Sequence, residues 1–256
     1  MAIGARARTG PFSGWWRSAA GGRLLGEAAL LASGLTLYRL VRFLTRDRVM
    51  AAFANARRVL SIEDHLGIAT ELHVQRLVIH HPAIVEALNR YYATVHFTSA
   101  ALVLALAYCV RRPVYVHLRR LFLGVTFLAL IGHVAFPLAP PRMLSSAGFL
   151  DTMALFGPNP YRSSHVASVA NQYAAMPSLH FAWSVLVAYG VIRCLRSRVR
   201  WVAIAHPVIT LIAIVATANH YWLDALVAAA LLGCVAAADH AWTGRQGARS
   251  RAALIA

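Results

Sequence analysis

Several stretches of this chain are apolar over about 20 residues, the length that an α-helix needs to cross the hydrocarbon core of a bilayer. They cover residues 23–44, 93–110, 121–138, 177–195, 201–218 and 221–239. Hydrophobic residues make up 59% of the sequence and charged residues only 13%, whereas a soluble domain normally carries about 25% charge. We therefore expect an all-α integral membrane protein, a bundle of six transmembrane helices.

The basic residues cluster at the ends of the apolar segments. The sequence has 25 arginines, no lysine and nine acidic residues, which gives a formal charge of +16. If both termini lie on one side, fifteen arginines fall on that side and eight on two longer segments of the other side. Because cytoplasmic segments carry the excess of positive charge, both termini are expected in the cytoplasm. No basic groove interleaved with aromatic residues indicates nucleic acid as a partner. The expected partners are the bilayer and its lipids.

The remaining sequence divides into two tails and two outer segments. Residues 1–21 and 241–256 are expected to be basic cytoplasmic tails, and residues 22–240 a single membrane domain. The first outer segment, residues 46–92, mixes apolar and charged side chains irregularly, which is typical of amphipathic helices at a membrane interface, here the extracytoplasmic one. We expect its Glu63 and Glu71 to form a solvated face or to pair with arginines, with head-group binding as the alternative.

The second outer segment, residues 137–176, begins with three prolines within residues 137–141. These prolines end the third span and stiffen the exit, so that Arg142 is held near the membrane surface. A guanidinium held there is suited to binding two phosphate oxygens; the alternative is an arginine that anchors the interface. Arg162 is a second candidate in the same segment. Asp151 is expected to cap a short helix.

The first of two histidine motifs, Met-Pro-Ser-Leu-His at residues 176–180, opens the fourth span. Proline suits the first position of a helix, so the helix is expected to start at Pro177. The unpaired N–H groups and the positive dipole end of such a start can bind an anion. Ser178 would add a hydroxyl donor, and His180 would lie in the first turn.

The second motif, residues 219–224, reads Asn-His-Tyr-Trp-Leu-Asp. His220 and Asp224 are four residues apart and so share one helix face. A carboxylate in that position can fix the imidazole tautomer and stabilise the protonated ring. The two motifs together supply a nucleophile, its carboxylate partner and a second histidine to protonate a leaving oxygen. Asn219 and Arg142 add donors for a phosphate group.

A metal site is the alternative for the second motif. A histidine and an aspartate four residues apart also form half of many metal sites, but the sequence offers no compact third and fourth ligand. We therefore expect neither a metal nor another cofactor. The remaining histidines of the spans, His96, His133 and His206, are expected to be packing residues. The cysteines are expected to be buried and unpaired; they are Cys109, Cys194 and Cys234.

The two histidine motifs resemble those of the type 2 phosphatidic acid phosphatase superfamily. Their order, after Pro140-Pro141-Arg142 and an Ala-Gly-x-x-x-Asp-like stretch at residues 147–151, is more similar to the branch that contains the fungal inositol phosphorylceramide synthases. The resemblance covers residues 137–224, and implies a six-helix membrane fold and metal-independent catalysis through a phosphohistidine. It implies that His220 is the nucleophile, Asp224 its partner, and His180 the acid that protonates the leaving group.

The chain departs from the usual phosphatase pattern in three places. Leu179 stands where the pattern has glycine, Ala213-Ile214 stand where it has Ser-Arg, and the usual lysine-containing first motif is absent. The charge of the phosphate would then be neutralised by Arg142, with Arg162 in reserve. These departures resemble the transferase branch.

Three functions fit these observations. A lipid phosphotransferase would move a phosphorylated head group to a lipid hydroxyl, whereas a lipid phosphate phosphatase, of the phosphatidic acid or polyprenyl phosphate type, would use water. A non-enzymatic membrane scaffold is the third. Because every chemical role is occupied, we expect an enzyme and not a scaffold. The resemblance implies an inositolphosphotransferase-like enzyme of the cell membrane, with the phosphatase as the alternative. The arginine bias predicts an active site facing the extracytoplasmic side. The lipid substrates and the oligomeric state are left open.

Overall fold

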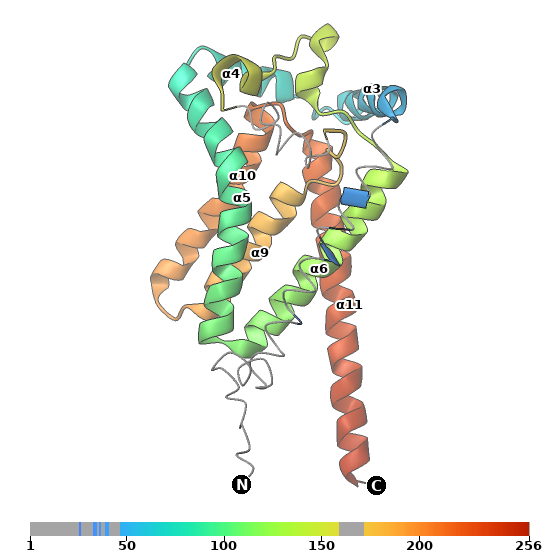
Figure 1. Cartoon of the computed structure of the whole chain (residues 1–256), viewed down its shortest axis with the longest axis vertical. Coiled ribbons are helices and arrows are strands. Elements are labelled where there is room, and N and C mark those ends of the chain that lie inside the picture. The colour runs from blue at the N-terminus through green and yellow to red at the C-terminus, as the bar shows by residue number, and fades with distance from the viewer. Residues whose placement is uncertain are drawn as a thin grey trace, which may run out of the picture. The chain divides into compact units, whose positions relative to one another are not determined.

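The computed structural model describes residues 47–158 and 172–255, with a few helical residues between 26 and 40 (Figure 1). In these ranges the regular elements are helices, and the only β-pairing is an isolated bridge between Leu138 and Ala174. The prediction of an all-α fold is therefore confirmed for the described part. The basic N-terminal tail, most of the first predicted span and Arg162 lie outside the described residues.

Among the described residues, four helical stretches are long and apolar enough to cross a membrane. They are α5 (Pro82–Val110), α6 (Arg112–Ala135), the run of η4 (Arg198–Ile204) with α10 (Ala205–Ala216), and α11 (Trp222–Ile255) over its part Trp222–Gln246. A fifth helix, α9 (Leu179–Cys194), is apolar but only 16 residues long. The chain is thus a multi-pass membrane protein, and a total of six spans stays a prediction.

The helices and the predicted spans differ at their ends. The span predicted at 93–110 belongs to a helix that already begins at Pro82, and the span predicted at 121–138 belongs to one that runs from Arg112 to Ala135. Hydropathy detects only the apolar part of each helix, whereas the hydrogen-bonded helix extends into its polar ends. The prolines that follow Ala135 end α6, as expected.

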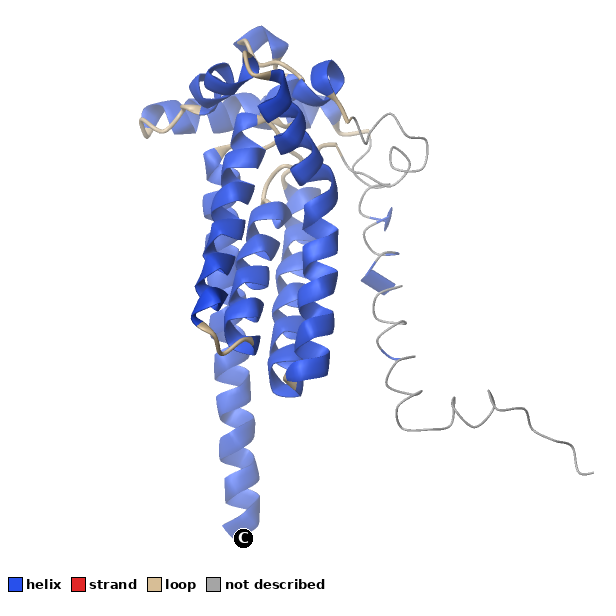
Figure 2. Ribbon diagram, turned by 90° about the vertical axis from the view of Figure 1, so that its left-hand side faces the viewer, coloured by secondary structure: helices blue, strands red, loops and turns tan. Residues whose placement is uncertain are grey.

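Two amphipathic helices, α3 (Val49–His65) and α4 (Glu71–Ile79), cross one end of the bundle (Figures 1 and 2). The helical prediction for residues 46–92 is confirmed, except that its last eleven residues form the start of α5. Three short helices from the segment between α6 and α9 lie at the same end, and the smaller of two apolar cores packs beneath them. These are η1 (Pro141–Met143), η2 (Ser145–Ala147) and α7 (Thr152–Phe156), and the core includes Ala52, Ala56, Val59, Leu138, Phe149 and Tyr221.

The main apolar core lies between α5, α6, α9 and α11. Its buried members include Val103, Leu118, Val125, Leu186 and Ala228. Cys194 is buried there, but Cys109 and Cys234 are exposed on the surface of the bundle, so the prediction of three buried cysteines was wrong. Both lie on spanning helices, whose outer faces are apolar because they meet lipid and not water.

Arginines gather at the end of the bundle opposite α3 and α4, around the α5–α6 and α9–η4 connections. Arg111 donates to the carbonyl of Arg193 at 2.9 Å, and Arg112 lies over the ring of Tyr108 at 4.1 Å. Arg120 pairs with Asp239 of α11. The bundle therefore has one strongly basic end, and α3 and α4, which we call the cap helices, cover the other end.

Helix packing in the main core depends on Gly190 of α9. A Cβ atom at this position would lie 2.6 Å from Val103 Cγ2 of α5 and 2.8 Å from Leu118 Cδ1 of α6. Gly190→Ala is therefore expected to destabilise the bundle by roughly 1–3 kcal/mol, since overpacking pushes neighbouring helices apart. Thermal unfolding of the purified chain in detergent measures the effect.

Gly233→Ala is the matched control for this prediction, because no atom lies within 4 Å of the added Cβ. Gly233 is inside α11, where alanine is the better helix former by about 1 kcal/mol. The control should keep or raise the midpoint of unfolding. A midpoint for Gly190→Ala equal to that of the control would contradict the packing role of Gly190.

Candidate functional site

His220 lies in a tight turn between α10 and α11, not on a helix as its spacing to Asp224 suggested. The amides of Asn219 and His220 both donate to the carbonyl of Ile214, at 2.9 and 3.1 Å. Ala218 has a φ of 54° and is the one non-glycine residue with positive φ in the described ranges, a conformation that costs roughly 1–2 kcal/mol. The chain reverses within these few residues, which leaves the His220 ring at the end of the bundle.

The tautomer of His220 follows from its neighbours. Its Nδ1 lies 2.9 Å from the carbonyl oxygen of Ala175 and 3.1 Å from Asp224 Oδ2. A carbonyl only accepts hydrogen bonds, so Nδ1 carries the proton and donates it. The neutral ring then has its lone pair on Nε2, the atom that can act as a nucleophile. The predicted His220–Asp224 contact is confirmed.

Backbone contacts bring the two histidine motifs together. The amide of Leu138 donates to the carbonyl of Tyr173 at 2.8 Å, and the amide of Ala175 donates back to Leu138 at 3.3 Å. This pairing holds the segment that leads into α9 against the exit of α6. The amide of Ser178 then donates to the carbonyl of Asp224 at 3.1 Å. The start of α9 is thereby fixed beside the start of α11.

The helix start near His180 differs from the prediction by two residues. α9 begins at Leu179 with Ser178 as its N-cap, and the Ser178 side chain accepts from the Phe181 amide at 3.4 Å. Pro177 lies before the cap, so the prediction that it occupies the first helical position was wrong. Serine is a favoured N-cap because its hydroxyl can accept from an amide of the first turn, and this places the helix start after Ser178. Ser178 is fully buried, and His180 lies in the first turn as expected.

His180 is part of a stack of four rings that α5 and α9 contribute alternately. Tyr92 of α5 covers one face of His180 with centroids 4.1 Å apart, and His96 of α5 covers the other at 4.2 Å. Trp183 of α9 stacks on His96 at 4.6 Å. The rings alternate because Tyr92 and His96 share one face of α5, as His180 and Trp183 do on α9. The His220 ring lies 5.6 Å from that of His180.

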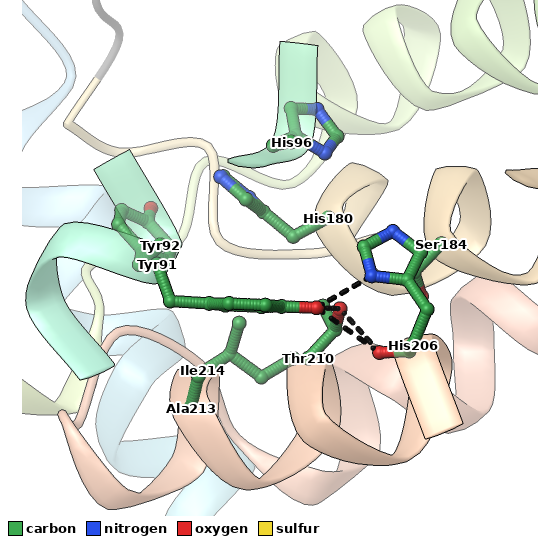
Figure 3. Close-up of a pocket in the computed structure, with 9 residues that line it drawn as sticks. All are labelled: Tyr91, Tyr92, His96, His180, Ser184, His206, Thr210, Ala213 and Ile214. Carbon is green, nitrogen blue, oxygen red and sulfur yellow. Dashed lines mark hydrogen bonds between the residues drawn. The ribbon is translucent and has the colours of Figure 1, made fainter. Parts of the chain in front are cut away.

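A small cavity opens beside the stack, between α5, α9 and α10 (Figure 3). The empty space at this place, counting the part open to solvent, is about 240 Å³, and the walls include His180, Ser184, Ala213 and Ile214. At its polar side, the Tyr91 hydroxyl lies 2.5 Å from His206 Nδ1 and 3.0 Å from Thr210 Oγ1. Ser99 Oγ lies 3.3 Å from His206 Nε2.

Several residues of this site were missed or assigned to packing. His96 and His206 were expected to be ordinary packing residues, yet one covers His180 and the other faces the cavity. Tyr91 and Tyr92 were not singled out at all. One sequence feature could have identified part of this site. Tyr92 and His96 are four residues apart in an apolar helix, a spacing that places two polar rings on one face.

Arg142, in η1 between α6 and α9, links this segment to the turn that contains His220. It is buried, its Nε donates to Asn219 Oδ1 at 3.0 Å, and its Nη1 lies 3.2 Å from Asp151 Oδ2. Its amide donates to the carbonyl of Ala218 at 2.8 Å. Asp151 also caps α7 through Met153 N and Ala154 N, which confirms the predicted helix cap. Arg142 and Asn219, both predicted to bind phosphate, thus lie next to His220.

Glu63 and Glu71 are buried, so the prediction of a solvated face or of pairing with arginines was wrong. Glu63 Oε1 accepts from the Leu223 amide at 2.7 Å and Glu71 Oε1 from the Trp222 amide at 3.1 Å. The first amides of a helix have no partner within the helix, and these carboxyls satisfy two of them in α11. Burial, followed by the hydrogen bond with Glu71, raises the pKa of Glu63 to about 9.

Within the described ranges, no three histidine, cysteine, aspartate or glutamate side chains are arranged to hold a metal ion. The imidazoles of His96 and His180 lie 4.2 Å apart between centroids, with their planes tilted by 33°. The site instead brings together an imidazole whose Nδ1 faces two acceptors and a second imidazole 5.6 Å away, with the Arg142 guanidinium bonded to the neighbouring Asn219. This set is suited to attack on phosphorus and to proton transfer to an oxygen.

A family model described as the PAP2 superfamily matches residues 57–238 of the chain. The chain belongs to the PAP2 superfamily. It is therefore a lipid phosphatase or phosphotransferase, and the match extends from α3 to α11, well beyond the two histidine motifs. Searches of curated proteins and of solved structures found no match.

The ring stack generates a prediction about His180. Tyr92→Leu removes the ring from one face of His180 and is expected to lower turnover of lipid phosphate on the order of tenfold, because a catalytic group that is free to tilt is misplaced. Tyr92→Phe keeps the ring and should retain turnover within about threefold. Steady-state assays of the purified variants measure both.

Tyr108→Leu is the matched control, since Tyr108 lies on the same helix but at the basic end, against Tyr115. It should leave turnover unchanged. Equal turnover of the Leu and Phe variants at position 92 would show that the stack does not position His180.

Proposed function

We propose that this PAP2 superfamily member is a phosphotransferase that moves a phosphorylated head group between lipids through a phosphohistidine at His220. The observation that carries this proposal is the double contact of His220 Nδ1 with Ala175 and Asp224, which leaves Nε2 as the reactive atom. The second imidazole, His180, lies 5.6 Å away between ring centroids.

The proposed first step is attack of His220 Nε2 on the phosphorus of the donor lipid. The bond between phosphorus and the leaving oxygen breaks, and His180 gives that oxygen a proton. The ring of His220 becomes cationic, and the carboxylate of Asp224 at Nδ1 stabilises this charge. In the second step His180 takes the proton from an acceptor hydroxyl, whose oxygen attacks the phosphohistidine and restores free His220.

We assign the phosphate-binding role to Arg142, with Asn219 beside it and Arg162 as a further candidate outside the described residues. Arg142 is held one hydrogen bond from Asn219, the neighbour of His220 in the sequence, so a phosphate held by its guanidinium would lie next to Nε2. Ser178 is fully buried and caps α9. We therefore assign Ser178 to holding the first turn of α9 and not to direct contact with phosphate, which revises its predicted role.

The wall of the cavity supports a lipid acceptor. Ala213 and Ile214, which stand where the usual phosphatase pattern has Ser-Arg, are buried and line the cavity beside His180. An apolar wall there accommodates carbon atoms near the acceptor hydroxyl. This favours transfer to a lipid hydroxyl. Inositol phosphate is proposed as the transferred group on the resemblance of the motif order to the inositolphosphotransferase-like branch.

A phosphatase of the phosphatidic acid or polyprenyl phosphate type is the second candidate, and one observation favours it. The enclosed part of the cavity has room for about one water molecule, and a buried water needs two to four polar partners. Tyr91, Ser184, His206 and Thr210 offer such partners around the cavity. A water held there would lie beside His180, the base of the second step.

The acceptor is identified by the products. Purified protein is incubated with phosphatidic acid, a polyprenyl phosphate, or phosphatidylinositol mixed with diacylglycerol or ceramide, and the lipids are analysed by mass spectrometry. The transferase predicts a new phospholipid with little free phosphate or inositol phosphate. Release of free phosphate without a new phospholipid would replace the transferase with the phosphatase.

The same assay tests the proposed catalytic residues. His220→Ala, His180→Ala and Asp224→Asn should each lower turnover by about a thousandfold or more, because members of such a set act as a unit. Alkaline quenching of the wild type should reveal the transferred group on the peptide that contains His220. His73→Ala, on the exposed face of α4, is the control and should keep full activity. An active His220→Ala variant would contradict the phosphohistidine mechanism.

We also propose that the site faces the extracytoplasmic side of the cell membrane. The support is the distribution of charge: arginines cluster around the short α5–α6 and α9–η4 connections, whereas those at the end with His180 and His220 are spread over longer segments that also contain most of the acidic residues. Positive charge favours the cytoplasmic side. A reporter fused after Ala256, at the end of α11, is expected in the cytoplasm; activity of an extracytoplasmic reporter at this position would reverse the assignment.

A further inference from the structure

The start of α11 presents three consecutive amides, and each donates to a buried carboxyl. Tyr221 N donates to Asp224 Oδ2 at 3.0 Å, Trp222 N to Glu71 and Leu223 N to Glu63. Asp224 belongs to α11 itself, whereas Glu63 and Glu71 come from the cap helices α3 and α4. Because the amides at a helix start have no partner inside the helix, these contacts determine where α11 begins relative to the cap.

Glu63 and Glu71 accept from consecutive amides of the same helix start, Leu223 N and Trp222 N, which places their carboxyls side by side. Both are almost completely buried, and Glu63 Oε2 meets no donor among the described residues. A hydrogen bond between two carboxyls requires a proton on one of them. The charged groups that act on Glu63 are themselves carboxyls, Glu71 and Asp224, while the neighbouring Tyr221 hydroxyl is neutral and donates to the carbonyl of Ala139.

One shared proton leaves the pair with a single negative charge. A single charge at a helix start is favourable, because the helix dipole places partial positive charge there. Loss of the proton would place two adjacent carboxylates in a buried site, with Asp224 as a third nearby. Repulsion among these groups would separate the cap helices from α11.

We propose that Glu63 and Glu71 form a proton-sharing pair that positions the His220 nucleophile by holding the first turn of α11 against the cap. His220 is two residues before Trp222, whose amide Glu71 accepts, so a shift of this turn moves the imidazole. This inference rests on the proposed function, since it assigns the two glutamates a role in the reaction of His220. Both are positioning residues, because neither touches a reacting atom.

A proton-sharing pair should make both the stability and the turnover of the protein depend on pH. The pKa of Glu63 is raised from 4.5 to about 9 by burial and then by Glu71. The native protein therefore keeps a proton that the unfolded chain releases above pH 4.5, so stability falls as pH rises through this interval. Turnover is expected to fall as pH rises through about 9, when the folded protein loses the shared proton.

The deciding variant is Glu71→Gln, which replaces one carboxyl with an amide that donates to Glu63 without a shared proton. The amide oxygen can still accept from Trp222. In this variant the fall in kcat near pH 9 should disappear, since the pKa of Glu63 falls once the like charge of Glu71 is gone and its ionisation no longer places two carboxylates side by side. Glu86→Gln removes an exposed carboxyl paired with Arg90 and is the control, with a wild-type pH profile.

A second variant tests the positioning itself. Glu63→Ala/Glu71→Ala removes both acceptors and should lower kcat on the order of 10- to 100-fold with a much smaller change in KM, because His220 and not lipid binding is disturbed. Glu63→Gln/Glu71→Gln should recover most of that loss. If the alanine variant does not fold, the glutamine variants and their pH profiles still decide the proposal.

Hydrogen–deuterium exchange separates this proposal from the proposed function. The amides of Trp222 and Leu223 should exchange slowly in the wild type and faster above about pH 9, after correction for the intrinsic rate, but not in Glu71→Gln. If the wild type turns over neither phosphatidic acid, nor a polyprenyl phosphate, nor phosphatidylinositol, the proposed function fails while the exchange data still test the pair. Exchange and pH profiles for Glu71→Gln that match the wild type would overturn the proton-sharing pair.

Discussion

The hydrogen bond from Ser178 N to the Asp224 carbonyl joins the two histidine motifs, and the geometry of the site depends on it. It ties the start of α9 to the start of α11, helices whose sequences are separated by all of η4 and α10. His220 is then held from both sides, because its Nδ1 donates to Ala175, before α9, and to Asp224, in α11. An imidazole with a fixed tautomer results from two helix starts packed against each other.

The motif spacings predicted the contacts of His220 and Asp151, but not the site roles of Tyr91, Tyr92, His96 and His206. His220 and Asp224 meet as their separation of four residues suggested, and Asp151 caps a helix as its position suggested. The local backbone was harder to predict: His220 lies in a turn with Ala218 at positive φ, and α9 starts after Ser178. Such details depend on which groups satisfy the ends of the helices, and these partners come from distant parts of the chain.

Contacts between distant segments account for the wrong predictions about Glu63, Glu71 and His96. Glu63 and Glu71 lie on helices whose pattern of apolar and charged residues is amphipathic, and that pattern assigns carboxylates to water. Their partners are amides about 150 and 160 residues later in the chain, and no property of residues 46–92 identifies those amides. The ring stack is a similar case, because His96 acquires its role only when α5 packs against α9.

The buried carboxyls also bear on how an anionic substrate is accepted. Asp151 and Asp224 are close to Arg142 and His220, so the site already carries negative charge beside its cation. Two ionised glutamates at the start of α11 would add repulsion toward a phosphate through the low-dielectric interior. A proton retained by Glu63 removes one of these charges. The cap helices α3 and α4 can therefore provide acceptors for the amides of α11 without making the site unfavourable for the phosphate that we propose Arg142 and His220 bind.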